Sequence, residues 1–141
     1  MVEFEVTAGI AAAAQRVWTL LADVESWPRW LPTVTLVDAL DGGPLAIGRR
    51  YRVEQPKLRP AVWTVTEFQS GTHFQWQARS PGMTMVADHA VTPLDGQAVQ
   101  IRLRFRFEGV LGALLGRMFG RTTRRYLQAE AQALKRQAET G

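Results

Sequence analysis

Residues 109–138 carry the most sustained helical pattern in the chain. Apolar and small side chains recur there at spacings of three and four, which places them on one stripe of a helix turning about 100° per residue. Basic side chains fall on another face, which we expect to meet water. The stripe consists of Leu111, Leu114, Leu115, Met118, Thr122, Tyr126, Ala129 and Ala133, and the basic face of Arg117, Arg121, Arg124 and Lys135. This pattern predicts one long amphipathic helix whose apolar side covers a second layer.

The rest of the chain is dominated by short segments in which apolar and polar residues alternate. The alternation is clearest in residues 97–107, where odd-numbered positions are apolar from Val99 onward and even-numbered ones are glutamine or arginine. Such a period of two is typical of a half-buried strand, and Asp95-Gly96 before it is a strong hairpin signal. Similar segments predict strands at 2–7, 33–40, 49–55, 61–68, 72–79 and 83–92, and helices at 11–22 and 27–31.

The predicted order is one strand, two helices, six strands and the long helix. Short turns between consecutive strands favour an antiparallel meander, and the long helix is the natural cover for its apolar face. We find no repeat or linker, so we predict a single domain over residues 1–141. The predicted class is α+β: a seven-stranded curved antiparallel sheet wrapped around the C-terminal helix, with a cavity between them.

Composition removes several kinds of chemistry from consideration. The chain has 141 residues, no cysteine and only two histidines, which disfavours disulfides, thiolate sites and multi-histidine metal sites; we predict no metal and no cofactor. The first residues do not resemble a signal peptide, and no stretch approaches the roughly 20 apolar residues of a membrane span, so we expect a cytoplasmic protein. A net charge of +4 from scattered basic residues is consistent with an ordinary solvated surface.

Four local features resemble the START-related superfamily of polyketide cyclases/dehydrases and lipid-transfer proteins, whose fold is called the helix-grip. They are Val17-Trp18 followed by Leu21-Ala22-Asp23 and Trp27-Pro28-Arg29-Trp30; Gly48 before a strand; Thr92-Pro93-Leu94-Asp95-Gly96 before the last strand; and Gly109-Val110-Leu111-Gly112 opening the last helix, with Leu134-Lys135 and Glu139 near its end. The resemblance covers nearly the whole chain. It implies a first strand beside the last one and a cavity between the sheet and the long helix. It does not specify an activity, because this superfamily contains both enzymes and carriers.

Strand parity and the helical stripe predict the lining of that cavity. Aromatic, aliphatic and methionine side chains dominate it, which suits an aromatic, polyketide-like or lipid ligand. Ordinary core packing remains the alternative for each residue. The predicted ligand-binding residues are Trp30, Tyr51, Val53, Trp63, Val65, Phe74, Trp76, Met85, His89, Leu103, Phe105, Leu115, Met118, Phe119, Thr122 and Tyr126.

Three polar residues of this set are candidates for catalysis: His89, Tyr51 and Tyr126. His89 is predicted to point inward, where it could act as a base or as a donor to a ligand carbonyl. A buried histidine satisfied by the protein is the alternative. The pattern places no carboxylate on the inner face to orient it, and it predicts that Asp88 and His73 face water.

Two surface features are also ambiguous. Gly112, Gly116 and Gly120 predict either a flexible start to the long helix or its close approach to the sheet. The apolar segment 110–119 and the arginines after it could touch a membrane surface. We expect the outer arginines Arg102, Arg104 and Arg106 to pair with Glu3 and Glu5 across strands, and we expect no nucleic-acid partner.

Three functional hypotheses follow. The first is a module, monomeric or homodimeric, that binds a small hydrophobic molecule. The second is a cofactor-independent polyketide cyclase, aromatase or dehydratase. The third is a protein that uses the arginine face of the last helix on anionic lipid or RNA.

Overall fold

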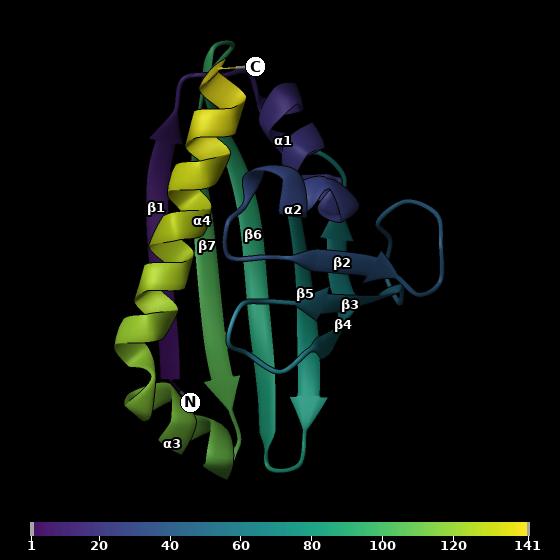
Figure 1. The fold of residues 1–141 in the computed structure, drawn as a ribbon. Coiled ribbons are helices and arrows are strands. Elements are labelled where there is room, and N and C mark those ends of the chain that lie inside the picture. Colours follow the sequence, from purple (N-terminus) through teal and green to yellow (C-terminus); the bar gives the residue numbers. More distant parts are fainter. Residues whose placement is uncertain (1, 141) are drawn as a thin grey trace.

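Seven antiparallel strands form one sheet in the computed structural model, which describes residues 2–140 (Figure 1). Their spatial order is β1-β7-β6-β5-β4-β3-β2, so the first strand lies beside the last. The predicted neighbour relation is therefore confirmed. The strands are β1 (Val2–Ile10), β2 (Leu36–Ala39), β3 (Arg50–Glu54), β4 (Ala61–Gln69), β5 (His73–Ser80), β6 (Met83–Asp95) and β7 (Ala98–Glu108).

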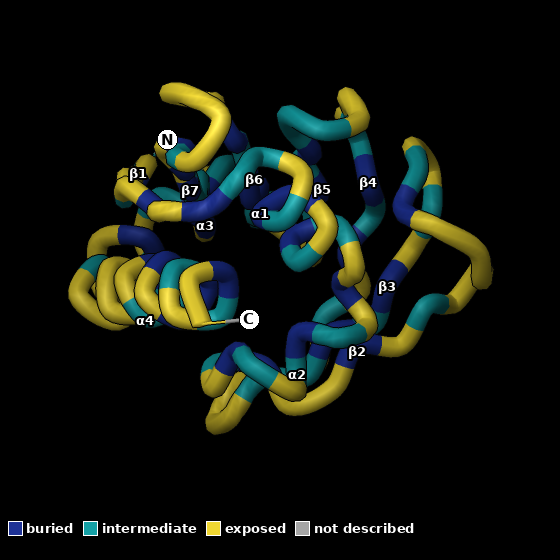
Figure 2. Tube along the Cα trace, turned by 90° about the horizontal axis from the view of Figure 1, so that it is seen from above, coloured by how far each residue is buried: buried dark blue, intermediate teal, exposed yellow. Residues whose placement is uncertain are grey.

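The helices lie on the inner side of the curved sheet. Seen from above, the sheet bends in an arc from β1 to β2 and α4 lies across its open side (Figure 2). This arrangement is the predicted helix-grip architecture, and the fold prediction is confirmed. The helical elements are α1 (Ala14–Ala22), the 3-10 turn η1 (Val24–Ser26), α2 (Trp27–Trp30), α3 (Val110–Met118) and α4 (Gly120–Thr140).

The prediction of one continuous C-terminal helix is wrong. Phe119 leaves the helical region, with φ −109° and ψ 23°, and separates α3 from α4. The predicted apolar stripe is also wrong along α3, because Leu111, Leu114 and Met118 are exposed while Gly112 and Gly116 are buried.

The reason for this reversal is the close approach of α3 to the sheet. A Cβ atom on Gly116 would lie 2.9 Å from Cβ of Val2, and one on Gly112 would lie 3.3 Å from the backbone of Phe107. Only glycine lets the helix backbone come this near, so the small residues take the inner side. Of the two explanations offered for the glycine repeat, close packing is the one that the contacts support.

The far end of α4 is fixed by apolar packing and by polar contacts. Leu127, Ala131 and Leu134 are buried against the sheet and α1. The Arg16 side chain donates to the carbonyl oxygens of Ala138 and Gln137 at 2.7 and 3.0 Å. These bonds satisfy C-terminal carbonyls that a helix leaves free, and they tie α4 to α1.

Other boundaries also differ from the predicted ones: β1 continues to Ile10 and β6 to Asp95, beyond the predicted ends at 7 and 92. The strand predicted at 33–40 is only Leu36–Ala39, and the helix predicted at 11–22 begins at Ala14. The strand prediction extended into residues 33–35, which lie in the connection after α2.

Candidate ligand pocket

A pocket of about 340 Å³ lies between the inner face of the sheet, the α3–α4 segment and the β3–β4 loop. Its walls are mostly aromatic and aliphatic, which suits an apolar guest. This is the cavity position that the sequence predicts. The lining residues are Thr33, Gln55, Leu58, Arg59, Ala61, Trp63, Met83, Met85, Phe105, Phe107, Leu115, Phe119, Thr122, Thr123, Tyr126, Leu127 and Glu130.

The β3–β4 loop and α4 are joined at this pocket by a single hydrogen bond. The Tyr126 hydroxyl donates to the carbonyl oxygen of Pro56 at 3.2 Å. Pro56 lies in the exposed loop between Gln55 and Ala61, and Tyr126 lies in the second turn of α4. The bond therefore holds a loop and a helix that would have to separate if the pocket widened.

A smaller hollow of about 60 Å³ continues the pocket toward the middle of the sheet. The two share Gln55, Trp63, Phe105, Leu127 and Glu130 as lining residues. Because they share walls, we treat them as one site with a wide outer part and a narrow inner part. The inner part adds Trp27, Val34, Val53, Trp76, Ala87, Asp88, His89, Leu103 and Arg104.

A histidine and a glutamate meet at the inner part of this site. Nε2 of His89 lies 3.5 Å from Oε1 of Glu130, close enough for an ion pair but longer than a normal hydrogen bond. His89 is 3% exposed, and its ring stacks on Phe74 with 4.2 Å between centroids. Within residues 2–140, neither Nδ1 of His89 nor Oε1 of Glu130 has a hydrogen-bond partner. Buried polar atoms are nearly always bonded, so these two are available to a ligand.

The pattern did not predict Glu130. The predicted helical stripe runs through Tyr126, Ala129 and Ala133, so Glu130 lies off it and the predicted inner side contains no carboxylate. Of that stripe only Ala133 is buried, and the other buried residues of α4 are Leu127, Ala131, Leu134 and Ala138. Glu130 is three residues after Leu127 and four before Leu134, a spacing that could have placed it inward.

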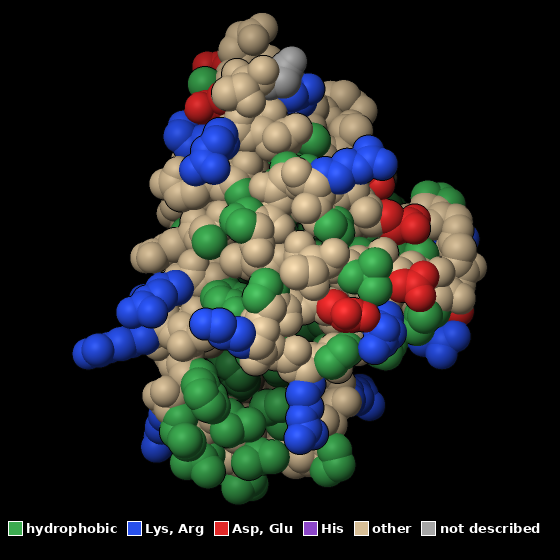
Figure 3. Space-filling view, in the orientation of Figure 1, with side chains coloured by type: hydrophobic (Ala, Val, Ile, Leu, Met, Phe, Trp, Pro, Cys, Tyr) green, Lys and Arg blue, Asp and Glu red, His purple; other side chains and the backbone are tan. Residues whose placement is uncertain are grey.

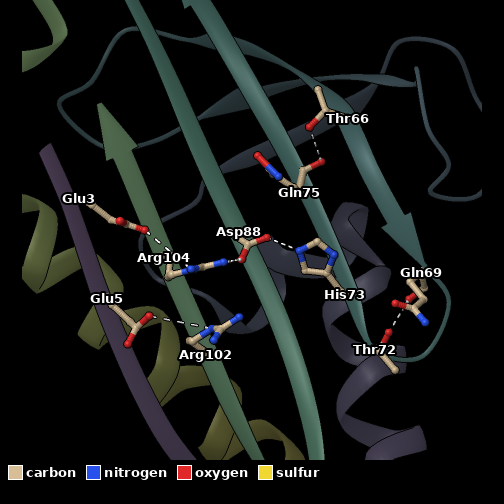
Figure 4. A network of polar contacts seen from close by, with 10 residues as sticks. All are labelled: Glu3, Glu5, Thr66, Gln69, Thr72, His73, Gln75, Asp88, Arg102 and Arg104. Atoms are coloured by element: carbon tan, nitrogen blue, oxygen red, sulfur yellow. Dashed lines mark hydrogen bonds and ion pairs between the residues drawn. The ribbon is translucent and has the colours of Figure 1, made fainter. Parts of the chain in front are cut away.

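Asp88, the neighbour of His89 on β6, occupies the opposite face and forms a separate network (Figure 4). Nη2 and Nε of Arg104 donate to Oδ2 of Asp88 at 2.9 and 3.2 Å, and Nε2 of His73 contacts Oδ1. Arg104 also pairs with Glu3 at 3.9 Å. The prediction that Asp88 faces water is wrong, because Asp88 is 6% exposed; His73 is half-buried and keeps part of its side chain in water.

This outer network changes the acidity of its members. Burial raises the pKa of Asp88, but the hydrogen bonds from Arg104 and His73 outweigh it and leave that pKa below its ordinary value. The same bond raises the pKa of Arg104. The predicted pairing of outer arginines with Glu3 and Glu5 is found for Arg104 and for Arg102, which lies 4.0 Å from Glu5. Arg106 pairs instead with Glu108.

Most of the predicted ligand-binding residues border this site, and whether they contact a ligand stays a prediction. Seven line the main pocket, and four more line only its inner part. The two groups are Trp63, Met85, Phe105, Leu115, Phe119, Thr122 and Tyr126, and Val53, Trp76, His89 and Leu103.

Five predicted residues border neither part. Tyr51, Val65 and Phe74 are buried in the core, and burial raises the pKa of Tyr51. Met118 is exposed, and Trp30 lies outside the lining with a buried, unbonded Nε1. Of the three catalytic candidates, His89 and Tyr126 therefore border the site and Tyr51 does not.

Several lining residues had no signal in the pattern. Thr33 lies in the connection before β2, and Gln55, Leu58 and Arg59 lie in the β3–β4 loop. Alternation identifies the inner face of a strand but does not say where a loop folds back. Within residues 2–140, no three histidine, aspartate or glutamate side chains converge as a metal site would require. No helix of that described part is both long and apolar enough to cross a bilayer.

Comparison with known proteins agrees with this architecture. The profile of a family described as polyketide cyclase/dehydrase and lipid transport matches residues 1–139. The chain belongs to this family. No curated protein matches the sequence significantly.

Several solved structures share the fold. The Zhui aromatase/cyclase from Streptomyces sp. R1128 is 21% identical, with a TM-score of 0.78 over 97% of this chain and 93% of its own. A START superfamily protein from Mycobacterium smegmatis is 18% identical, with a TM-score of 0.76 over 99% and 98%. The di-domain ARO/CYC BexL from the BE-7585A biosynthetic pathway is 23% identical, with a TM-score of 0.72 over 95% of this chain and 46% of its own. At these identities the likeness concerns the fold.

Proposed function

We propose that this member of the family binds one small hydrophobic molecule, aromatic or polyketide-like, in the pocket between the sheet and α3–α4. The observation that carries the proposal is the contrast inside the site. Its walls are mostly apolar, and its inner end presents two buried polar atoms without partners, on His89 and Glu130. An apolar body with one polar end satisfies both features. The family description, which includes lipid transport, is consistent with such a ligand.

The test is binding of a hydrophobic dye, Nile red, to the purified protein and to a variant with the pocket filled. Met85 lines the pocket and is only half-buried, so Met85→Trp places an indole in the free volume. Ile47→Trp is the matched control, because Ile47 is exposed in the β2–β3 loop. We expect wild type and Ile47→Trp to bind alike and Met85→Trp to lose at least about tenfold in affinity.

Native mass spectrometry followed by organic extraction completes this test by identifying any molecule that the purified protein retains. Equal dye binding by all three proteins would place the dye elsewhere. Absence of both a retained molecule and dye binding would overturn the proposal.

A second candidate function, dehydration coupled to cyclisation, is favoured by the His89–Glu130 pair. An imidazole, which can take up and return a proton, faces a carboxyl group at the end of an apolar site. Elimination from a β-hydroxy ketone requires such a proton-transferring group. His89, oriented by Glu130, would remove the proton α to the carbonyl and pass it to the departing hydroxyl. The C–H electrons form the C=C bond, the C–O bond breaks and water leaves. The proton that His89 took up leaves with this water, so the imidazole returns to its starting state.

This reaction is measured directly by mass spectrometry as the loss of 18 mass units from an aromatic β-hydroxy ketone. Glu130→Gln and His89→Gln should abolish turnover and leave Nile red binding within about threefold. Binding without turnover in the wild type would leave the ligand-binding proposal standing and remove the enzymatic one.

A further inference from the structure

The outer side of α3 is an unpartnered apolar surface. Val110, Leu114 and Met118 follow one another at intervals of four and are 91%, 55% and 64% exposed. Figure 3 shows hydrophobic side chains gathered at the lower end of the molecule, over α3 and the start of α4. Contiguous exposed apolar surface of this kind marks a contact with a partner or a membrane. We call the exposed side chains of Val110, Leu111, Leu114, Met118 and Phe119 the α3 face.

This exposure is built into the way α3 is docked. The glycines Gly112 and Gly116 occupy the side against the sheet, where larger residues would collide with Phe107 and Val2. Leu111 donates its backbone N–H to the carbonyl of Gly82 at 3.1 Å, which fixes the start of the helix on the β5–β6 turn. Turning the leucines inward would therefore require moving the helix off the sheet. Leu111, Leu114 and Met118 are therefore left on the outer side of α3, while Leu115 lines the pocket.

The segments around the α3 face are rich in basic residues, and the acidic residue that adjoins them, Glu108, is paired with Arg106. The β3–β4 loop, the β5–β6 turn with its flanks, and residues 109–129 contain seven of the seventeen basic residues and none of the thirteen acidic ones. The remaining chain, with ten basic and thirteen acidic residues, is net acidic. The seven are exposed, and none of them pairs with an acidic residue in the described chain: Lys57, Arg59, Arg79, Arg117, Arg121, Arg124 and Arg125.

We propose that the α3 face and these seven residues form a docking surface for an anionic lipid bilayer. Apolar side chains bordered by lysine and arginine are the composition of a helix that lies in a membrane interface. A second copy of this chain is the poorer occupant, because two such surfaces would bring their positive charges together. RNA is also poorer, since it would use the charges and leave the apolar side chains in water.

The position of the surface links it to the pocket. Phe119 belongs both to the α3 face and to the pocket lining, and Leu58 and Arg59 on the β3–β4 loop border the same pocket. A protein seated on this surface would place its pocket against the bilayer, so an apolar guest could pass between them with little exposure to water. The docking itself does not depend on the proposed ligand, because the surface is formed without one.

The test is sedimentation with vesicles of phosphatidylcholine alone or with about 30% phosphatidylglycerol. The apolar variant is Leu114→Ser with Met118→Ser, and the charge variant is Arg121→Gln with Arg125→Gln. Both pairs are exposed, so folding should be kept, which urea unfolding checks. Ile47→Ser with Leu94→Ser is the matched control, since both side chains are more than 60% exposed but lie in the β2–β3 loop and at the end of β6.

We expect wild type and control to bind the anionic vesicles and to bind neutral ones far less. The charge variant should lose about 30-fold and the apolar variant about tenfold or more. A single Leu114→Cys variant, unambiguous because the chain has no cysteine, should show a blue-shifted environment-sensitive dye on anionic vesicles, whereas Ile47→Cys should not.

Two results would overturn the proposal. One is no binding to anionic vesicles at low salt. The other is binding that the apolar variant leaves unchanged, particularly if RNA competes for it, since the surface would then be a general polyanion site. Nile red binding by the same variants separates this outcome from failure of the pocket.

Discussion

Two adjacent residues of β6, Asp88 and His89, each belong to a histidine–carboxylate pair, and the two pairs differ in almost every respect. Asp88 meets His73 on the outer face, where Arg104 adds two hydrogen bonds. His89 meets Glu130 on the inner face, at 3.5 Å, with buried polar atoms left unbonded. Figure 4 displays the outer pair within a larger set of charges that reaches Glu3 on β1.

The comparison separates stabilisation from function. A buried carboxylate whose partners are all in place rigidifies the sheet, and losing one partner is costly. A buried pair with unused hydrogen-bonding atoms contributes little to stability and is available to a ligand. We therefore expect substitutions in the outer pair to change unfolding and substitutions in the inner pair to change binding.

The largest effect should come from removing the centre of the outer pair. Asp88→Ala leaves Arg104 and His73 without their acceptor and should lower the free energy of unfolding by about 2 kcal/mol. Glu130→Gln, the matching change on the inner face, should lower it by less than about 0.5 kcal/mol. Urea unfolding followed by tryptophan fluorescence measures both. Equal losses would show that the two pairs do not divide their roles in this way.

The second-largest effect should come from lowering the pH, which weakens the outer pair. The folded-state pKa of Asp88 lies below its unfolded value of about 3.9, so its stabilisation is present above that pH and is lost as the pH falls through the folded-state pKa. The difference in unfolding free energy between wild type and Asp88→Asn should therefore shrink between pH 5 and pH 2. A difference that stays constant over this interval would contradict the assigned direction of the pKa shift.

The inner pair should respond to ligand polarity. Wild type should bind 2-naphthol more tightly than naphthalene by about tenfold, which is the contribution of one hydrogen bond to a charged group. Glu130→Gln and His89→Phe should each bring the ratio of 2-naphthol to naphthalene affinity toward one, while the affinity for naphthalene stays within about threefold of wild type. Fluorescence titration of both compounds provides the ratio. An unchanged preference in both variants would remove the pair from ligand recognition.

The smallest effect concerns the contact between α4 and the β3–β4 loop. Tyr126→Phe keeps the ring and removes the hydrogen bond to Pro56. Because that bond is exposed, we expect Kd to change by less than about threefold, while both association and dissociation become a few-fold faster. Stopped-flow mixing with 2-naphthol measures the rates, and Gln128→Ala is the control, because Gln128 is an exposed residue of α4 outside the pocket lining. Unchanged rates would show that the loop does not limit exchange.

The two faces also mark how far the pattern of residues reaches. Alternation along β6 correctly put His89 inward and Asp88 outward, because successive side chains of a strand point to opposite faces. Alternation does not show that other side chains cover part of the outer face, so it predicts that Asp88 and His73 are exposed to water. The burial of Asp88 on that face depends on the long side chain of Arg104, which belongs to the neighbouring strand β7.

The C-terminal segment shows a different limit. A rule based on apolar periodicity assumes that large side chains mark the buried side. In α3 the small residues mark it, since Gly112 and Gly116 pack where a Cβ atom would collide. The same assumption left Leu127 and Leu134 out of the predicted stripe in α4, so the inward position of Glu130 was not predicted either. Local pattern and resemblance were enough to predict the strand order and the fold. Predicting the His89–Glu130 pair would have required knowing how the C-terminal helix docks on the sheet.

The central claim is that a guest enters the pocket and places its polar end at the inner pair. The chain has two histidines, one in each pair, so a ¹H–¹³C correlation spectrum of the imidazole groups contains one probe for each face. Titration with 2-naphthol should move the His89 signal in a saturable manner and leave the His73 signal in place, and Met85→Trp should suppress the change. A His89 signal that stays fixed while 2-naphthol binds to saturation would contradict the account.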